Sequence, residues 1–309
     1  MQQRRRLTAK KLSHFIPLYI MLLPGFIYIL INNYVPMAGI VVAFKQYNYQ
    51  LGIWGSRFIG LSNFEFLFKT REAWIITRNT LLYNIAFIVV GTTISIAVAT
   101  LLNEIHWEQG KKFYQTVILT PFLISIVVVS YLVYAFLSTE YGFINKSILE
   151  PLGCARISWY SQPRYWPLIL LSVNVWKYFG YNCIIYYATL VGIDRTYYEA
   201  AVIDGANRWQ QFCHVTIPGL LPTISILTLM AIGRIFYSDF GLFYQVPLNS
   251  GPLIDVTNTI DTYVYRGLIE LNNIGMASAA GLYQSSVGFV LVLLANFLVR
   301  RFSQESALF

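Results

Sequence analysis

Two basic residues stand alone inside long apolar runs, and they are the first candidates for binding chemistry. Lys177 lies within residues 165–193 and Arg234 within residues 215–237. Counted as helix from Pro167, Lys177 lies ~15 Å along its run, close to the middle of a bilayer. A charge at that depth costs at least ~2.5 kcal/mol on insertion scales, so it should face other helices or water. Two interpretations stay open: each cation attracts an anionic group, or it is held by backbone carbonyls.

Aromatic and hydrogen-bonding side chains surround both cations. Aromatic faces with a few polar groups suit sugar rings, which have an apolar face and a polar edge. The alternative is structural, with the aromatic residues forming a belt at the membrane interface. The candidate residues for a path through the membrane are Asn174, Lys177, Tyr178, Tyr181, Asn182, Arg234, Tyr237 and Asp239.

Residues that commonly carry catalysis are scattered. The three cysteines and three histidines fall in separate segments: Cys154, Cys183, Cys213, His14, His106 and His214. This spacing fits neither a disulfide framework nor a metal site. The chain also lacks a nucleotide-binding P-loop and the G-x-S-x-G and H-E-x-x-H motifs. We therefore expect no catalytic residues, no metal site and no cofactor bound by this chain.

A polar island, residues 194–222, separates two of the apolar runs. Thr196 and Glu199 are spaced as a capping box, which predicts the start of a short helix. Gly205 favours a helix end because glycine tolerates the left-handed conformation. A second helical piece is expected over residues 207–215. The pattern predicts a short helix with small residues on its surface, held outside the membrane between two spans.

The residue types in this island resemble the EAA loop of permease subunits in binding-protein-dependent ABC importers, most closely the carbohydrate-uptake branch of the type I importers. The matching positions are Glu199, Ala200, Ala201, Asp204, Gly205, Ala206, Phe212 and Pro218. The segment from Phe58 to Phe64 resembles the F-x-G-L-x-N-F element that precedes the second helix in sugar permeases. The resemblance implies that residues 194–214 form a cytoplasmic coupling helix that sits in a groove of the ATPase. The alternative is an ordinary cytoplasmic loop whose alanine pair packs well.

The composition indicates an integral membrane protein. The 309 residues are 56% hydrophobic and 12% charged, with a mean hydropathy of +0.54, whereas soluble proteins average about 25% charged residues. The net charge of +8 does not form one basic, aromatic-studded face, so nucleic acid is not expected as a partner. Basic residues are concentrated in short segments beside the spans, the arrangement that orients membrane proteins.

Six spans are predicted within a single domain, residues 1–309. They cover about 15–33, 79–103, 113–139, 165–193, 215–237 and 272–299, with residues 34–44 on the outer surface or extending the first span. Pro121 is expected to kink the third span. Residues 46–74, 140–164 and 239–271 are expected outside. Both termini and the EAA loop would then lie in the cytoplasm. The predicted fold is all-α, the six-helix fold of type I importer permeases.

The resemblance implies a permease subunit of an ABC importer for a carbohydrate, closest to permeases for polysaccharide-derived oligosaccharides. It implies a bacterial cytoplasmic (inner) membrane location and four kinds of partner: a second homologous permease, two ATPase subunits that bind ATP and Mg²⁺, an extracytoplasmic solute-binding protein and the lipid bilayer. An acidic sugar would suit Lys177 and Arg234. The alternatives are an ABC permease for a non-sugar solute and a secondary transporter, although the latter should carry repeats and acidic residues inside its spans. No such acid is found in the predicted span interiors.

Overall fold

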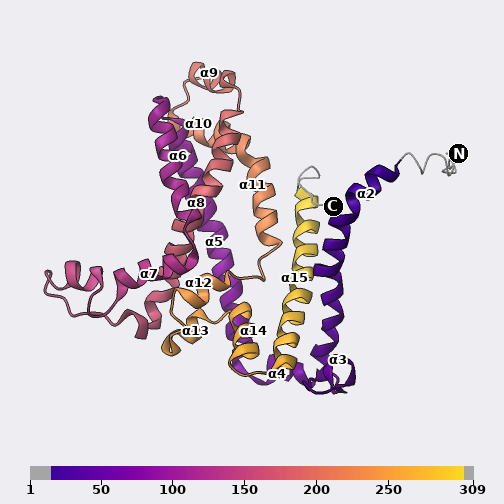
Figure 1. Ribbon diagram of the computed structural model, residues 1–309. Helices are drawn as coiled ribbons and strands as arrows, with labels where there is room; N and C mark the ends of the chain where they lie inside the picture. Colours follow the sequence, from indigo (N-terminus) through magenta and orange to yellow (C-terminus); the bar gives the residue numbers. More distant parts are fainter. Residues whose placement is uncertain (1–14, 303–309) are drawn as a thin grey trace.

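The computed structural model describes residues 15–302, which form a helical bundle (Figure 1). Within these residues, five helical stretches are long and apolar enough to cross a membrane, and a bent pair makes a sixth candidate. The predicted all-α membrane fold is confirmed. The long helical elements are α2 (Ile16–Ile29), α5 (Arg71–Asn103), α6 (Glu108–Leu123), α7 (Ile126–Leu137), α8 (Trp166–Val191), α11 (Ile217–Ile232) and α15 (Ile274–Phe302).

Short elements connect these helices. At one end of the bundle lie β1 (Lys45–Gln46), α3 (Gly52–Gly55), β2 (Arg57–Phe58), α4 (Glu65–Lys69), α12 (Phe240–Gln245), α13 (Ile254–Thr257) and α14 (Ile260–Ile269). At the opposite end, beyond the bundle, lie α9 (Arg195–Ile203) and α10 (Arg208–Gln211). Tight 3-10 turns cover Ser62–Phe64, Trp159–Ser161, Pro163–Tyr165 and Gly251–Leu253, and wide π turns cover Ile144–Leu149 and Phe212–Thr216.

The first span is longer than predicted. A π turn (Leu30–Tyr34) and a 3-10 helix (Val35–Phe44) continue α2 without a break, so residues 34–44 extend the span. The chain then forms the antiparallel pair β1–β2, in which Lys45 faces Phe58. Asn63, within the F-x-G-L-x-N-F match, donates hydrogen bonds to the carbonyls of Ala43 and Lys45, at 2.9 Å each. This element therefore ties the end of the first span to the start of the second.

The third predicted span is broken, and this corrects the expectation of one kinked helix over residues 113–139. α6 and α7 meet at an angle of 96°. Pro121 lies inside α6, and the break falls after it, where Ile124 and Ser125 have extended backbone. Ser125 then caps α7 by accepting a hydrogen bond from the Val128 amide at 3.4 Å. A polar N-cap in the middle of an apolar run thus starts a new helix in a new direction.

The fifth predicted span also ends early. α11 stops at Ile232 rather than at residue 237, because Gly233 begins a run of turns. The following residues were expected to lie outside, but α12, α13 and α14 fold against the outer halves of α5, α8 and α15 (Figure 1). Several of their apolar side chains are fully buried, among them Leu242 and Phe243 of α12 and Ile260 of α14. The free energy gained by burying this apolar surface exceeds the cost of burying the polar residues that had predicted a loop.

The second span begins at Arg71, eight residues before its predicted start, so Trp74 lies in a helix rather than in the outer segment.

The core between α5, α6 and α8 is tight. Ser95 of α5 donates to the carbonyl of Phe179 at 3.1 Å, and Gly180 of α8 lies directly against the Ile118 carbonyl of α6. A side chain at residue 180 would collide with that backbone, so the glycine permits the close approach of the two helices.

Candidate functional site

The helix α9 is capped by Asp194, not by the predicted box of Thr196 and Glu199. The Asp194 side chain accepts a hydrogen bond from the Thr196 amide at 3.0 Å. This hydrogen bond to the ionised form holds the pKa of Asp194 below its usual value. The helix therefore begins one residue before Thr196, and Glu199 points out from its second turn instead of folding back onto the cap.

The end of α9 has the geometry expected from Gly205. This residue has a φ of +79°. The Gly205 amide bonds the Val202 carbonyl at 3.0 Å, and the Ala206 amide bonds the Ala201 carbonyl at 2.9 Å. These two bonds form a Schellman motif, which closes a helix through a left-handed residue. Space around Gly205 is open, so its conformation rather than crowding requires glycine.

The second piece of the island, α10, starts with a true capping box. The Asn207 side chain accepts from the Gln210 amide at 2.9 Å, and the Gln210 side chain accepts from the Asn207 amide at 2.8 Å. Phe212 stacks on Trp209, with ring centroids 5.4 Å apart. Local hydrogen bonds therefore fix the two short helices α9 and α10, which Gly205 separates.

The surface of the helix pair is exposed and partly apolar. Ile203 is 85% exposed and Trp209 is 70% exposed, and Tyr197 and Val202 are exposed as well. Among the EAA residues, Glu199, Ala200, Asp204, Gly205 and Pro218 are exposed, whereas Ala201, Ala206 and Phe212 are half-buried. Exposed apolar residues outside the spans, rimmed by polar groups, mark an interaction surface.

Polar contacts fasten this helix pair to the bundle. Arg208 forms an ion pair with Glu104 of the α5–α6 connection at 3.1 Å, and the Tyr198 hydroxyl lies 3.0 Å from that of Thr216. A cavity of about 850 Å³ lies between α9 and the α5–α6 connection, with Glu199 and Lys111 in its lining. A displacement of α9 would therefore act on the inner ends of α5 and α6 as well as on α8 and α11.

Lys177 is buried and turned toward the break between α6 and α7. Its ammonium group donates to the carbonyls of Pro121 at 3.5 Å, Phe122 at 3.4 Å, and Ile124. The last carbonyls of a helix have no partner within that helix, and they cannot be left bare at membrane depth. Of the two interpretations of this residue, the structure therefore shows the pairing with backbone carbonyls.

The segment that follows α11 is unwound. Its freed carbonyls accept side-chain hydrogen bonds: Asn84 donates to Ile235 at 2.8 Å and to Tyr237 at 3.0 Å, and Gln284 donates to Phe236 at 2.8 Å. Asn84 and Gln284 each lie roughly a dozen residues, or ~18 Å, inside their helices from the outer end. Irregular backbone at this depth is tolerated where it is buried in protein or lines a water-filled cavity.

Two carboxylates lie beside the unwound segment. Asp239 accepts from the Tyr178 hydroxyl at 2.7 Å and caps α12 through the Leu242 amide at 3.2 Å. Asp261 accepts from the amide and the hydroxyl of Ser238, at 2.7 Å each. Both acids lie between α11 and α15, outside the helices that are long and apolar enough to cross a membrane. Both carboxylates are engaged in hydrogen bonds that hold the local fold.

The remaining path candidates lie around this segment. Arg234 is exposed, two residues beyond the end of α11 and not within a helix as expected. Tyr237 is exposed and its hydroxyl lies 3.3 Å from that of Ser285. Tyr181 is exposed and stacks on Phe122, with centroids 4.8 Å apart. Asn174 and Asn182 are half-buried on α8.

Sequence reasoning missed the residues that hold the unwound segment. Asn84 and Gln284 are polar residues inside apolar runs, so a search for such interruptions would have found them. Asp261 gave no signal, because it lies in a segment whose polarity was typical of a loop.

The fold and the site together define a multi-pass helical permease that displays a helix pair outside its spans. The model of the family described as "binding-protein-dependent transport system inner membrane component" matches residues 91–304, and the chain belongs to this family. The family that the resemblance at residues 199–218 predicted is therefore confirmed.

Relatives over almost the whole chain support the same assignment. The polygalacturonan/rhamnogalacturonan transport system permease protein YteP of Bacillus subtilis is 35% identical over 305 residues, 98% of this chain and 94% of the relative. Protein LplB of the same organism is 34% identical over 289 residues, 93% of this chain and 90% of the relative. A crystal structure of a bacterial ABC transporter involved in the import of the acidic polysaccharide alginate matches with a TM-score of 0.87 and 33% identity, covering 95% of this chain and 98% of that one. A second structure of an alginate ABC transporter, in complex with an alginate pentasaccharide-bound periplasmic protein, matches with the same TM-score and identity and covers 96% of this chain and 98% of that one.

Proposed function

We propose that this chain is the transmembrane subunit of an ABC importer for acidic oligosaccharides. Polygalacturonan and alginate, which the names of a relative and of a structural match contain, are both polyuronates. The observation that carries the proposal is Arg234, an exposed cation in the unwound segment that follows α11. A guanidinium there is too costly to face lipid, and it matches the geometry of a carboxylate. It would face a water-filled path and meet the uronate groups of the sugar.

The path itself would be lined from α8 and from the unwound segment. Tyr181 and Tyr237 offer exposed rings on which sugar faces can stack, and Tyr237 also offers a hydroxyl. Asn174 and Asn182 would supply amide groups to sugar hydroxyls. Lys177 has its donors engaged with carbonyls, so its part would be to hold the α6–α7 break open beside the path.

The helix pair α9–α10 would be the site through which ATP hydrolysis acts. ATP and Mg²⁺ would be bound by two partner ATPase subunits and not by this chain. The apolar residues Ile203 and Trp209 would enter the partner's surface, with Glu199 offering a carboxylate beside them. Both termini would then lie in the cytoplasm, because α2 starts and α15 ends at the same end of the bundle as α9 (Figure 1). A solute-binding protein would deliver the sugar at the opposite end.

The alternative of a secondary transporter meets a specific difficulty in this fold. A coupling carboxylate must exchange its proton or ion during transport. Asp239 and Asp261, the acids beside the unwound segment, each hold two or more hydrogen bonds that fix that segment. We therefore assign them a structural role.

Uptake by a host strain that lacks its own copy of this permease tests the substrate class. Radiolabelled oligogalacturonate and a neutral oligosaccharide of equal length would be supplied to strains with and without the chain. The proposal predicts that uptake of the acidic sugar depends on the chain and that the neutral sugar competes weakly. Equal or preferred uptake of the neutral sugar would contradict the acidic substrate while leaving the permease role intact.

A further inference from the structure

The first half of α5 carries polar side chains on the face that meets the segment between α11 and the start of α14. They recur at spacings of one, three and four residues along the helix: Asn79, Thr80, Tyr83 and Asn84. Side chains with these spacings share one face of a helix. All four form hydrogen bonds with the backbone of residues 235–260. This face of α5 therefore holds the segment that begins with the unwound residues around Arg234.

These hydrogen bonds join groups that are shielded from water. Asn79 is 5% exposed and donates to the carbonyls of Asp255 at 3.0 Å and Asn258 at 2.9 Å. Thr80 is fully buried and accepts from the Ile260 amide at 3.1 Å. Leaving a buried donor or acceptor without its partner is costly. The segment must therefore follow a shift of α5.

The other end of α5 is joined to the helix pair α9–α10. Glu104, which directly follows α5, forms an ion pair with Arg208, the first residue of α10, at 3.1 Å. Phe212, which directly follows α10, packs against an apolar cluster to which α5 contributes Ile96 and Ala99. The helix α9 itself buries no residue. The ion pair and the Phe212 contact, rather than packing of α9, therefore join the helix pair to α5.

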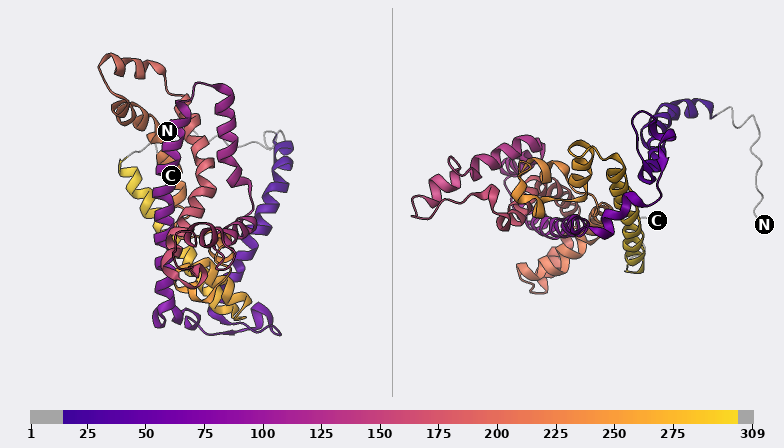
Figure 2. Two further views of the ribbon diagram at one scale, coloured as in Figure 1. Left: turned by 90° about the vertical axis from the view of Figure 1, so that its left-hand side faces the viewer. Right: turned by 90° about the horizontal axis from the view of Figure 1, so that it is seen from below.

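Between these two ends α5 is one continuous helix. It has 33 residues and is ~50 Å long. It contains no proline, a common cause of sharp kinks in helices. Figure 1 and the left view of Figure 2 show α5 extending from α4 to the end of the bundle at which α9 and α10 lie. A displacement at the Glu104 end is therefore carried to the polar face at the other end.

We propose that the Glu104–Arg208 ion pair transmits the movement of α9–α10 through α5 to the segment around Arg234. The inference rests on the proposed function, in which the ATPase moves α9–α10. Glu104 and Arg208 are then positioning residues, because they act on the path through α5 and not by touching the sugar. Their side chains are 52% and 80% exposed, so the pair adds little to the stability of the fold. A pair of this kind changes an equilibrium by a factor of up to about five.

Charge reversal in the reconstituted importer tests this role. Glu104→Arg and Arg208→Glu each bring like charges together, and the double variant restores opposite charges. The measured quantity is the amount of sugar taken up per ATP hydrolysed in the presence of the loaded binding protein. Each single variant is expected to lower this ratio roughly two- to fivefold, and the double variant is expected to restore most of it. A double variant that stays as low as Arg208→Glu would overturn the proposal, because Arg208 would then act on another partner.

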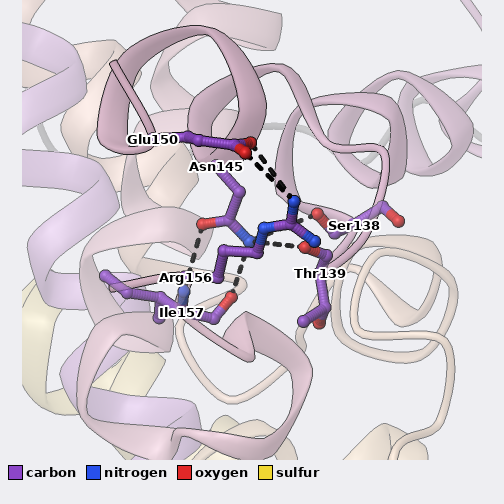
Figure 3. A network of polar contacts seen from close by, with 6 residues as sticks. All are labelled: Ser138, Thr139, Asn145, Glu150, Arg156 and Ile157. Carbon is purple, nitrogen blue, oxygen red and sulfur yellow. Dashed lines mark hydrogen bonds and ion pairs between the residues drawn. The ribbon is translucent and has the colours of Figure 1, made fainter. Parts of the chain in front are cut away.

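A second ion pair of the chain supplies the matched control. Arg156 and Glu150 lie 3.2 Å apart, are each 51% exposed and belong to one loop, residues 138–165 (Figure 3). This pair does not join α5 to α10. Glu150→Arg and Arg156→Glu are therefore expected to leave the ratio of uptake to ATP hydrolysis unchanged. An equal loss in these variants would contradict a specific role of the Glu104–Arg208 pair.

The movement itself can be followed at the far end of α5. A cysteine would replace Tyr237, which is exposed in the segment that α5 holds, in a chain whose three native cysteines are replaced by alanine. ATP is expected to change the rate at which this cysteine reacts with a maleimide. The change should be lost in Glu104→Arg and return in the double variant, whereas a merely structural pair would alter the thermal midpoint and not this response.

The outcomes separate this proposal from the function on which it rests. If uptake by the unmodified chain requires ATP and the single charge variants keep both the ratio and the ATP response, the ion pair transmits nothing and the importer assignment stands. If uptake by the unmodified chain proceeds without ATP, the proposed function itself fails.

Discussion

Replacing Lys177 by methionine is the most informative perturbation of the spans, because it removes the donors at the α6–α7 break without changing side-chain length. The ammonium holds three carbonyls, two of them through long bonds of 3.4 and 3.5 Å. A hydrogen bond to a charged group contributes about 1.5–3 kcal/mol, so three bonds of mixed quality amount to about 5 kcal/mol. Methionine also removes the cost of inserting a charge, at least ~2.5 kcal/mol. The difference leaves the variant less stable by about 2 kcal/mol.

The assay is thermal inactivation of the purified importer, followed by ATPase activity stimulated by the loaded binding protein. A loss of about 2 kcal/mol corresponds to a midpoint lowered by about 4–8 °C. Transport of acidic and neutral substrates should fall by the same factor, because the break is part of the scaffold. Lys112→Met, the same substitution at an exposed position in the second turn of α6, should leave the midpoint unchanged. An unchanged midpoint for Lys177→Met, with selective loss of acidic sugar uptake, would refute the reasoning and return Lys177 to the path.

Four further predictions concern the helix pair, the path and the topology. Gly205→Val should insert normally in the membrane but lose uptake and ATPase association, because a β-branched residue resists a φ of +79°. Gly205→Asn should retain uptake and ATPase association. Full transport by the valine variant would count against the coupling role. Asp194→Ala should weaken coupling, and Asp194→Asn should preserve it. Because the folded state lowers the pKa of Asp194, its stabilisation of α9 is present above the usual pKa and is lost as the pH falls through the lowered pKa. Coupling measured as a function of pH would show this loss. Arg234→Gln should raise the KM for an acidic oligosaccharide by roughly 10–100-fold, because a charge-assisted hydrogen bond is lost. The KM for a neutral oligosaccharide should stay unchanged. Equal effects on the two KM values would remove Arg234 from the path. Cysteine at Trp54 should react with an impermeant maleimide in intact cells and cysteine at Ile203 only after permeabilisation, and the reverse pattern would invert the topology.

The sequence predicted best where local chemistry decides the structure. The left-handed turn at Gly205 and the two helical pieces around it follow from residues within a few positions, and the structure contains both. The apolar runs predicted six spans, and the described part of the chain has five helical stretches of sufficient length and hydropathy, or six if the bent pair α6–α7 is one span.

Tertiary contacts decided the rest. The break after Leu123 depends on Lys177, more than fifty residues away, which compensates the carbonyls that the break exposes. The early end of α11 depends on Asn84 and Gln284 in two other helices, which bond the carbonyls that it frees. A count of apolar residues cannot distinguish a continuous span from one whose freed backbone is rescued by distant side chains. For the same reason the depth of Arg234 and Asp239 could not be obtained by counting along a straight helix.

Reconstituted transport is the most direct test of the central claim that this chain couples ATP hydrolysis in partner subunits to sugar uptake. The chain, its second permease and the ATPase would be placed in proteoliposomes with ATP and Mg²⁺ on the ATPase side, the loaded binding protein on the other side, and no ion gradient. The account predicts uptake of the acidic oligosaccharide that requires ATP and the binding protein and is lost with Gly205→Val. Uptake that proceeds without ATP and follows an imposed proton or sodium gradient would contradict it.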